Sequence, residues 1–450
     1  MNFRLLKKCS NAIYHIDIYN MFMYVTLFFF LMTCFISFYK TKISITYVNK
    51  YALLPLLIII FIGLLRGKYF SKKLYILCLF FVGWIIISYL LRGDSLLNKN
   101  NFFILLNRCS FCMVAIPFGH FINDIKRRKY LDSFILITII LAAILLWLCY
   151  IGVLTGENIS LFSGKYKFGA SYTITGRIKL KVLNLHYYHL GYLSLMCFCG
   201  CLYLAVSYWR KLFIPVWIFL LTTFGCGILF TYSRTAIFTF IGGLLIAFYI
   251  LLRNMHFEKT TRILVFTSVS VLAILLTING INGIYSIMHS IRNIWYGITT
   301  LSSRTTIWSC VIDIFADYPY ALLCGFSLED IVPMINNYLP SLDHVSHMHS
   351  GYLQTLLSLG LPGFIGVVAY SAYVIKCCIN ILLCKHRATF TNAERIMTIL
   401  PITCMVVGMF ESTIFYNASN IEIFNLFTAL FSGYIIDIAN KNKVKQVPHE

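Results

Sequence analysis

Charged residues are scarce in this chain of 450 residues: Asp, Glu, Lys and Arg together make up 12% of it, and only 16 residues are acidic. Hydrophobic residues make up 59%, which is more than a soluble protein of this length can bury. Apolar stretches of about 17 to 25 residues, each long enough to cross a bilayer as a helix, recur from end to end. The composition therefore predicts a polytopic membrane protein in contact with the lipid bilayer and excludes a large aqueous domain.

The sequence also lacks the common signatures of metal and nucleotide chemistry. No CxxC pair is followed by a second pair or by histidines, and there is no P-loop, no dinucleotide fingerprint and no Asp-x-Asp pair for a metal-held nucleotide sugar. Most of the 16 cysteines lie in apolar runs, where they act as small hydrophobic residues. Cys310 and Cys324 share one polar loop, so a disulfide between them stays open. We expect neither a metal nor a cofactor.

Twelve apolar runs are candidate transmembrane helices, and they predict an all-α membrane fold in a single domain, residues 1–450. Their approximate bounds are 20–38, 51–65, 74–91, 102–121, 131–153, 187–208, 212–231, 236–252, 262–280, 361–384, 396–415 and 421–438.

Positive charge sets the predicted orientation of these helices. The 37 basic residues give a net charge of +21, and most of them fall in alternate short loops, which the positive-inside rule makes cytoplasmic. Topology therefore explains the charge, and nucleic acid is not an expected partner. An even number of spans puts both termini in the cytoplasm, and the basic, uncleaved N-terminus indicates a retained first span.

Two long loops remain on the external side, residues 154–186 and 281–350. The first is basic and contains Arg177, against the topology rule. Either it binds an anionic ligand or a loop of this length escapes the rule.

Two arginines lie in stretches predicted to be external, Arg234 in a short turn between two spans and Arg304 in the long loop 281–350. Arg234 follows one span directly, where snorkelling to the interface is the simpler explanation. Arg304 comes after a serine N-cap and one helical turn before Trp308. The apolar face of residues 304–315, with Trp308, Val311, Ile312 and Phe315, predicts an amphipathic helix on the membrane surface.

The stretch from His347 to Gly363 predicts a broken helix. His347 and His349 precede an apolar run that is too short to span a membrane and stops at Gly360, Pro362 and Gly363. The glycines allow a sharp reversal and the proline fixes it. Broken helices occur at membrane depth only where they line a cavity. Residues 351–363 would then place His349, a general base near neutral pH, at the mouth of a cavity.

These residues resemble the bacterial O-antigen polymerase and ligase superfamily. Its signature of His, then Asn, Ser or Gln, nine residues and Gly-x-x-Gly is matched by His349, Ser350, residues 351–359 and Gly360-Leu-Pro-Gly363. An arginine in a Ser-Arg-Thr-Ala stretch is matched by Arg234, and an arginine four residues before a tryptophan by Arg304. Cys324-Gly325-Phe326 departs from the pattern, because many relatives carry Gly-x-Gly there.

The resemblance implies a GT-C-like, metal-independent, inverting glycosyltransferase of the bacterial inner membrane, with a periplasmic active site. His349 would activate the acceptor hydroxyl, and Arg234 and Arg304 would bind the diphosphate of an undecaprenyl-diphosphate-linked oligosaccharide. Arg177, Trp308 and His347 would help to bind substrate, and residues 360–363 would act as the hinge.

The acceptor stays open. A polymerase, which we favour, adds the chain to the next lipid-linked repeat unit and works with a chain-length regulator, whereas a ligase transfers it to lipid A–core. A transporter of lipid-linked sugars is a more remote alternative, since such proteins show repeated halves that this sequence lacks.

Overall fold

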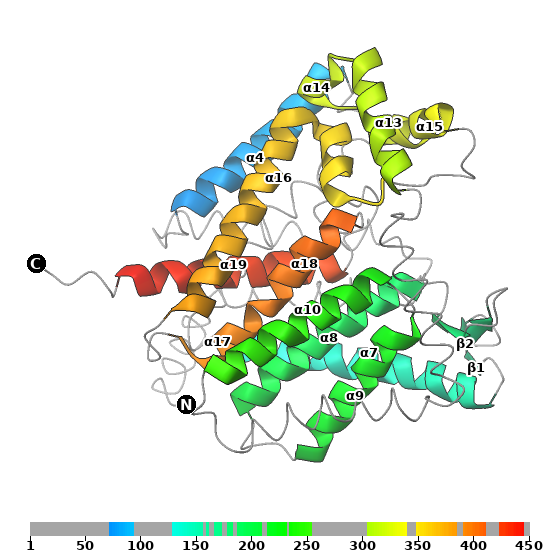
Figure 1. The fold of residues 1–450 in the computed structure, drawn as a ribbon, viewed down its shortest axis with the longest axis vertical. Helices are drawn as coiled ribbons and strands as arrows, with labels where there is room; N and C mark the ends of the chain where they lie inside the picture. Colours follow the sequence, from blue (N-terminus) through cyan, green and yellow to red (C-terminus); the bar gives the residue numbers. More distant parts are fainter. Residues whose placement is uncertain are drawn as a thin grey trace, which may run out of the picture.

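The computed structural model describes residues 72–93, 128–155, 159–161, 166–172, 178–182, 187–208, 214–231, 234–253, 304–339, 348–384, 390–410 and 423–444. Long helices dominate these ranges and pack side by side in a bundle (Figure 1). They are α4 (Lys72–Leu91), α7 (Arg128–Thr155), α8 (Tyr187–Tyr208), α9 (Ile214–Phe230), α10 (Arg234–Arg253), α16 (Gly351–Leu383), α18 (Ile399–Phe410) and α19 (Ile423–Val444). Shorter helices are α13 (Arg304–Asp317), α14 (Ala321–Cys324), α15 (Leu328–Tyr338) and α17 (Asn392–Met397).

Eight of the twelve predicted spans fall on these helices, and the runs 20–38, 51–65, 102–121 and 262–280 lie outside the described residues. Within the described ranges, Leu131–Thr155, Leu190–Tyr208 and Gly351–Leu383 are long and apolar enough to cross a membrane. Leu79–Leu91, Ile214–Phe230 and Thr235–Ala247 are shorter apolar helical stretches. The helices confirm a helical membrane protein, whereas twelve spans and a GT-C arrangement stay predictions.

Hydroxyl side chains within the apolar helices bond to their own backbone. Thr138 donates to the carbonyl of Phe134 at 2.9 Å, and Ser194 donates to that of Leu190 at 2.8 Å. Such a bond back to the preceding turn lets a polar residue lie in an apolar environment without an unsatisfied donor.

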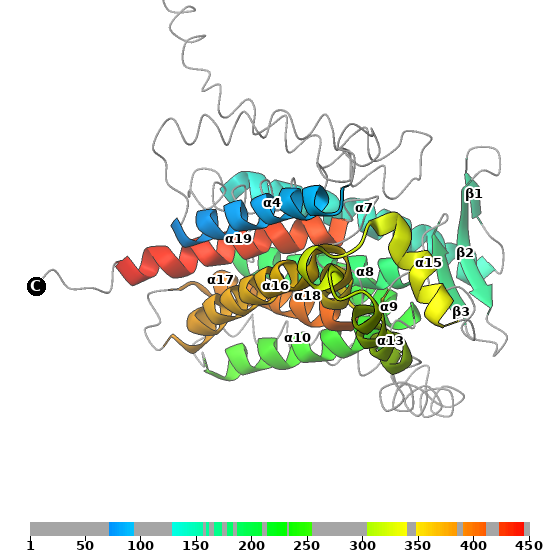
Figure 2. The same ribbon diagram turned by 90° about the horizontal axis from the view of Figure 1, so that it is seen from above.

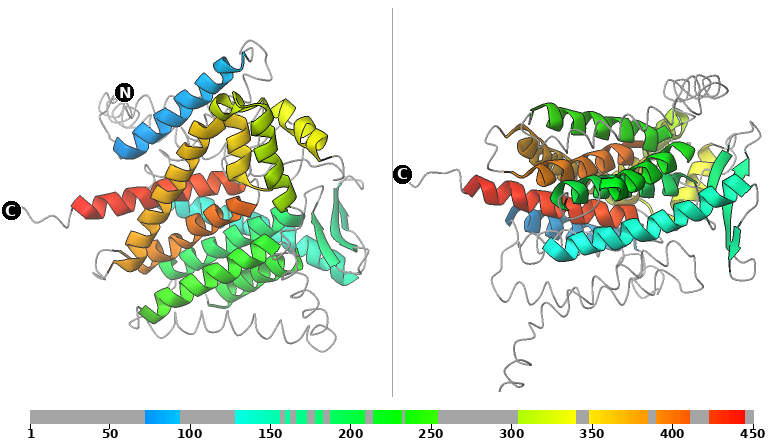
Figure 3. Two further views of the ribbon diagram at one scale, coloured as in Figure 1. Left: turned by 45° about the horizontal axis from the view of Figure 1, so that its top comes forward. Right: turned by 90° about the horizontal axis from the view of Figure 1, so that it is seen from below.

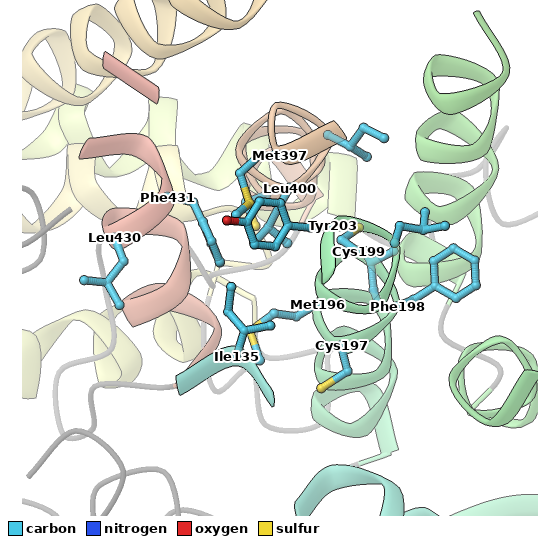
Figure 4. Packing of buried hydrophobic residues seen from close by; sticks show 14 of the residues in the cluster. Ile135, Met196, Cys197, Phe198, Cys199, Tyr203, Met397, Leu400, Leu430 and Phe431 are labelled. Carbon is cyan, nitrogen blue, oxygen red and sulfur yellow. The ribbon is translucent and has the colours of Figure 1, made fainter. Parts of the chain in front are cut away.

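The main hydrophobic core lies among α7, α8, α16, α18 and α19. Figure 4 shows Tyr203 of α8 beside Met397, Leu400 and Phe431 from the C-terminal helices, and Met196 of α8 beside Ile135 of α7. Burial of this apolar surface joins helices that are distant in the sequence.

Two buried polar contacts add to this packing. Asp132 of α7 is 6% exposed and accepts hydrogen bonds from the hydroxyls of Tyr203, at 2.9 Å, and Tyr208. Arg395 is 2% exposed and donates to the carbonyls of Ile381, Leu382 and Cys384 at 3.2–3.3 Å. Arg395 therefore caps the C-terminal end of α16.

The segment 154–186 contains a small antiparallel sheet that sequence analysis did not predict. Its strands are β1 (Ile159–Leu161), β2 (Tyr166–Tyr172) and β3 (Ile178–Val182), in the order β1-β2-β3. Phe168 pairs with both Ile159 and Val182. The all-α prediction is therefore correct for the helical body and incomplete here. The sequence did not reveal the sheet, because short strands such as the three-residue β1 carry too little periodicity to predict from sequence.

The sheet lies with α13 and α15 at the end of the molecule opposite the C-terminus (Figures 1 and 2). Both views therefore place the described parts of the two segments predicted to be external at one end of the helical bundle. This arrangement is the one expected if both face the same side of a membrane.

Candidate functional site

Helix α16 consists of two arms separated by a break at Gly360. The backbone there has φ 68° and ψ −171°, outside helical geometry. The short arm, residues 351–359, and the long arm, residues 361–383, meet at this residue (left view of Figure 3). The break stands where the sequence predicts one.

The backbone at Gly360 passes very close to the backbone at the end of α14 and just after it. A Cβ atom on Gly360 would lie 2.4 Å from the carbonyl oxygen of Leu323, and one on Gly325 would lie 2.4 Å from the carbonyl carbon of Ser358. Gly325 also has a positive φ, 71°. Two glycines with left-handed backbones therefore let the segment after α14 and the break of α16 touch without side chains between them.

The other two predicted hinge residues have separate roles. Pro362 lies in the first turn of the long arm, where a missing backbone N–H costs no hydrogen bond. A Cβ atom on Gly363 would lie 2.3 Å from the Cβ of Leu359. Gly363 is thus required by the sharpness of the break itself.

His349 stands just before the short arm with an uncommon backbone. Its φ is +50°, and within the described residues it is the one non-glycine residue with positive φ. The side chain is half-buried, with Nδ1 turned into the protein. A left-handed non-glycine residue costs energy and persists where its surroundings fix it, which is common at functional sites.

The surroundings of His349 do fix its backbone through its neighbour Met348. The indole N–H of Trp308 donates to the carbonyl oxygen of Met348 at 3.1 Å, and the N–H of Met348 donates to Oε1 of Gln354 at 3.2 Å. The hydroxyl of Ser350 accepts from the N–H of Leu353 at 3.4 Å and caps the short arm. Both backbone groups of Met348 are thus held, and His349 lies between this clamp and the helix cap.

Arg304 is brought to the same region by α13. It begins this helix and lies one turn before Trp308, so their Cβ atoms are about 5–6 Å apart on one face. Ile307 and Ile314 of α13 pack with Met348 and Leu357 in a second, separate hydrophobic cluster. The structure therefore joins the predicted Arg304–Trp308 pair to the His349 segment.

The same cluster corrects the prediction of a surface helix at 304–315. Val311 and Phe315 are buried within the protein, Trp308 is half-buried, and of the predicted apolar face only Ile312, at 72%, is largely exposed. The physical reason is that α15 and the short arm of α16 supply apolar side chains that cover this face. The hydroxyl of Tyr338 on α15 also donates to Asp317, which raises the pKa of Tyr338 to about 12.

The cysteines of this region are free thiols. Cys310 lies on α13 and Cys324 at the end of α14, and both are buried. The disulfide that the sequence left open is therefore absent from the structure.

The remaining predicted site residues are less fully described. Arg234 is the first residue of α10, which packs against α18 and α8. Arg177 and His347 lie outside the described residues. For these three residues, a place in the site stays a prediction.

Sequence reasoning missed Arg92, Trp84 and Gln354. Arg92 and Trp84 come from α4 and its end, and both donate to backbone carbonyls at the break of α16. Their partners lie more than 260 residues away along the chain, so no local pattern reveals them. The position of Gln354 one turn after Ser350 was a usable signal, since an amide there can reach back past the helix start.

Comparison with known families gives a match to part of this chain. The family model described as O-antigen ligase matches residues 218–368. That range contains Arg234, Arg304, Trp308, His349 and the break at 360–363. No curated protein matches the chain.

The match supports a role of the O-antigen ligase and polymerase type in surface polysaccharide assembly, in a membrane setting. Through residues 218–368, about a third of the chain, it supports the predicted resemblance to the O-antigen polymerase and ligase superfamily.

Proposed function

We propose that this protein is a glycosyltransferase that moves a glycan from undecaprenyl diphosphate to an acceptor sugar hydroxyl. The observation that carries the proposal is the left-handed backbone of His349, φ +50°, held by Trp308 and Gln354 at the start of a broken helix. Strain of this kind is maintained by other contacts and favours a role in which the exact direction of the imidazole matters.

His349 is the general base in this proposal. Because Nδ1 is turned into the protein, Nε2 is the nitrogen that takes the proton from the acceptor hydroxyl. The resulting oxygen forms a bond to the anomeric carbon, and the bond from that carbon to the diphosphate oxygen breaks. Undecaprenyl diphosphate leaves with the electron pair, and attack from the opposite face inverts the anomeric configuration.

Arg304 and Arg234 bind the donor diphosphate. Guanidinium groups suit this task because their planar fork contacts two phosphate oxygens and keeps its charge at every physiological pH. They would also stabilise the negative charge that grows on the leaving diphosphate, so the step requires no metal. Arg177 and His347 stay proposed contacts to the substrate. Trp308 was predicted to bind substrate, and its bond to Met348 favours a positioning role instead.

The lipid-linked donor reaches the protein by diffusion within the plane of the membrane. We place the protein in the bacterial inner membrane with both termini in the cytoplasm and His349 on the periplasmic face. The gathering of the sheet, α13 and α15 at one end of the molecule supports this orientation (Figure 2).

The acceptor is either the next lipid-linked repeat unit or lipid A–core. We favour the polymerase, with a chain-length regulator as its partner. The description of the matching family as O-antigen ligase keeps the ligase close as the second candidate.

A lipopolysaccharide gel tests both the reaction and the acceptor. A host deleted for this gene is complemented with wild type, His349→Asn or His349→Gly at matched membrane levels. Both replacements tolerate positive φ, so they keep the backbone while removing the imidazole. Loss of a general base lowers the rate by about 10²–10⁴-fold.

The lipopolysaccharide gel pattern of the deletion strain identifies the acceptor. Core with a single repeat unit indicates a polymerase, whereas bare core with long polymer still on undecaprenyl diphosphate indicates a ligase. A full ladder from His349→Asn protein would contradict the assignment of His349 as base.

A further inference from the structure

Arg92, just after α4, contacts three backbone carbonyls that surround the break of α16. Its Nη1 donates to the carbonyl oxygens of Cys324 at 3.1 Å, Phe326 at 3.2 Å and Ser358 at 2.7 Å. Its guanidinium carbon lies 4.4 Å from the ring centre of Tyr89. Arg92 lies outside the matched family segment, residues 218–368.

The break creates the need for these donors. Where a helix stops, its last carbonyls lose their partners four residues further on. Here each carbonyl of residues 357–359 receives a donor from elsewhere in the chain. The N–H of Phe326 reaches Leu357 at 2.7 Å, Arg92 reaches Ser358, and the indole N–H of Trp84 reaches Leu359 at 2.8 Å. Two segments, α4 with its end and the residues after α14, therefore meet the break of α16.

Charge favours this arrangement as well. The carbonyl end of the short arm carries the negative end of the helix dipole, where a cation is stabilising. Because the Arg92 guanidinium also donates to Cys324 and Phe326, it joins the end of α14 and the residues after it to the short arm. Stacking on Tyr89 holds the guanidinium in place against α4.

We propose that Arg92 is a positioning residue for His349. The inference rests on the proposed function, because it assumes that the direction of the imidazole matters for transfer. The short arm runs about 13 Å from the break to His349, at about 1.5 Å per residue. The clamp at Met348 fixes one end of this arm, and Arg92 fixes the other. Although Arg92 is a cation, it acts on backbone carbonyls and not on the donor diphosphate.

Hydrogen–deuterium exchange tests this role without any substrate. The full chain is measured in lipid nanodiscs as wild type, Arg92→Leu, Arg92→Lys and Arg395→Leu. Arg395 is the matched control, because it also donates to three carbonyls of residues near an end of α16, but at the end far from His349. We expect Arg92→Leu to speed exchange across residues 349–359 by at least about tenfold, the effect of losing a hydrogen bond to a charged donor. Arg395→Leu should leave those amides unchanged.

Steady-state transfer with an undecaprenyl-diphosphate-linked oligosaccharide then separates positioning from substrate binding. Arg92→Leu should lower kcat and leave KM for the donor within about twofold, since an interaction felt only in the transition state acts on kcat. Arg92→Lys should restore most of kcat, because an ammonium offers three N–H donors to three carbonyls.

The outcomes separate the role of Arg92 from the proposed function. Unchanged exchange at residues 349–359 in Arg92→Leu, equal loss of kcat in Arg395→Leu, or a raised donor KM at full kcat would each overturn the role of Arg92. Full transfer by His349→Asn, or none by wild type, would instead overturn the proposed function and the inference with it.

Discussion

Replacement of Gly360 by alanine tests the backbone crossing on which the site depends. The added Cβ would stand 2.4 Å from the carbonyl oxygen of Leu323 and 2.7 Å from that of Leu322. Real Cβ atoms do not approach other atoms this closely, and backbone atoms cannot rotate aside as a side chain would. The segment after α14 and the short arm of α16 would therefore have to move apart.

The expected cost has two parts. An L-residue at φ +68° loses about 1–2 kcal/mol. Overpacking against fixed atoms adds about 1–3 kcal/mol. The sum of roughly 2–5 kcal/mol is a large share of the roughly 5–15 kcal/mol by which proteins are stable.

Gly93 provides the control that separates the two parts. Its φ is +74°, close to that of Gly360, yet a Cβ atom there would meet no atom within 4 Å. Gly93→Ala should thus cost only the conformational part, about 1–2 kcal/mol. Free energies of unfolding in mixed micelles of rising SDS fraction, together with glycan transfer in cells, compare the two variants. Equal stability and equal transfer for Gly360→Ala and Gly93→Ala would refute the close crossing.

Three further predictions concern individual side chains. Ser350→Ala should destabilise the protein by about 0.5–2 kcal/mol through loss of the N-cap, and Ser350→Asp should recover it, as unfolding in the same micelles would show. Burial and nearby Asp313 raise the pKa of the Cys310 thiol, so its thiolate is scarce at neutral pH. Cys310 and Cys324 are both buried, so maleimide should label both slowly at pH 7, and Cys310 should label faster above about pH 9. Because both are free thiols, a reducing agent should change neither transfer nor gel mobility. Asp132→Leu should cost about 1–3 kcal/mol for each tyrosine hydroxyl left buried, and Asp132→Asn should cost less because its carbonyl still accepts.

Much of the helical body was predictable from the sequence because lipid imposes simple rules. Apolar runs must be helical where no water can satisfy the backbone, so α7 and α8 begin and end within a few residues of the predicted bounds. The break at Gly360 was also predictable, because glycine and proline act locally through the backbone. The small sheet at 159–182 was not, since its pairing joins short segments across loops.

The environment of α13 could not be read from its sequence. Its apolar face fits a membrane surface as well as a protein interior, because both are non-polar. Only the positions of α15 and the short arm of α16 show that Val311 and Phe315 face protein. The disulfide stayed open for a similar reason, since loop proximity in sequence does not fix the distance between two thiols.

The membrane setting, the order of the apolar helices and the residues that match the superfamily signature follow from the amino-acid sequence, because composition, periodicity and motif spacing are local properties of the chain. How His349 is held follows only from the packing of distant segments. The bonds of Trp308 to Met348 and of Arg92 to Ser358 span 40 and 266 residues, and contacts at such separation form only when distant helices have packed.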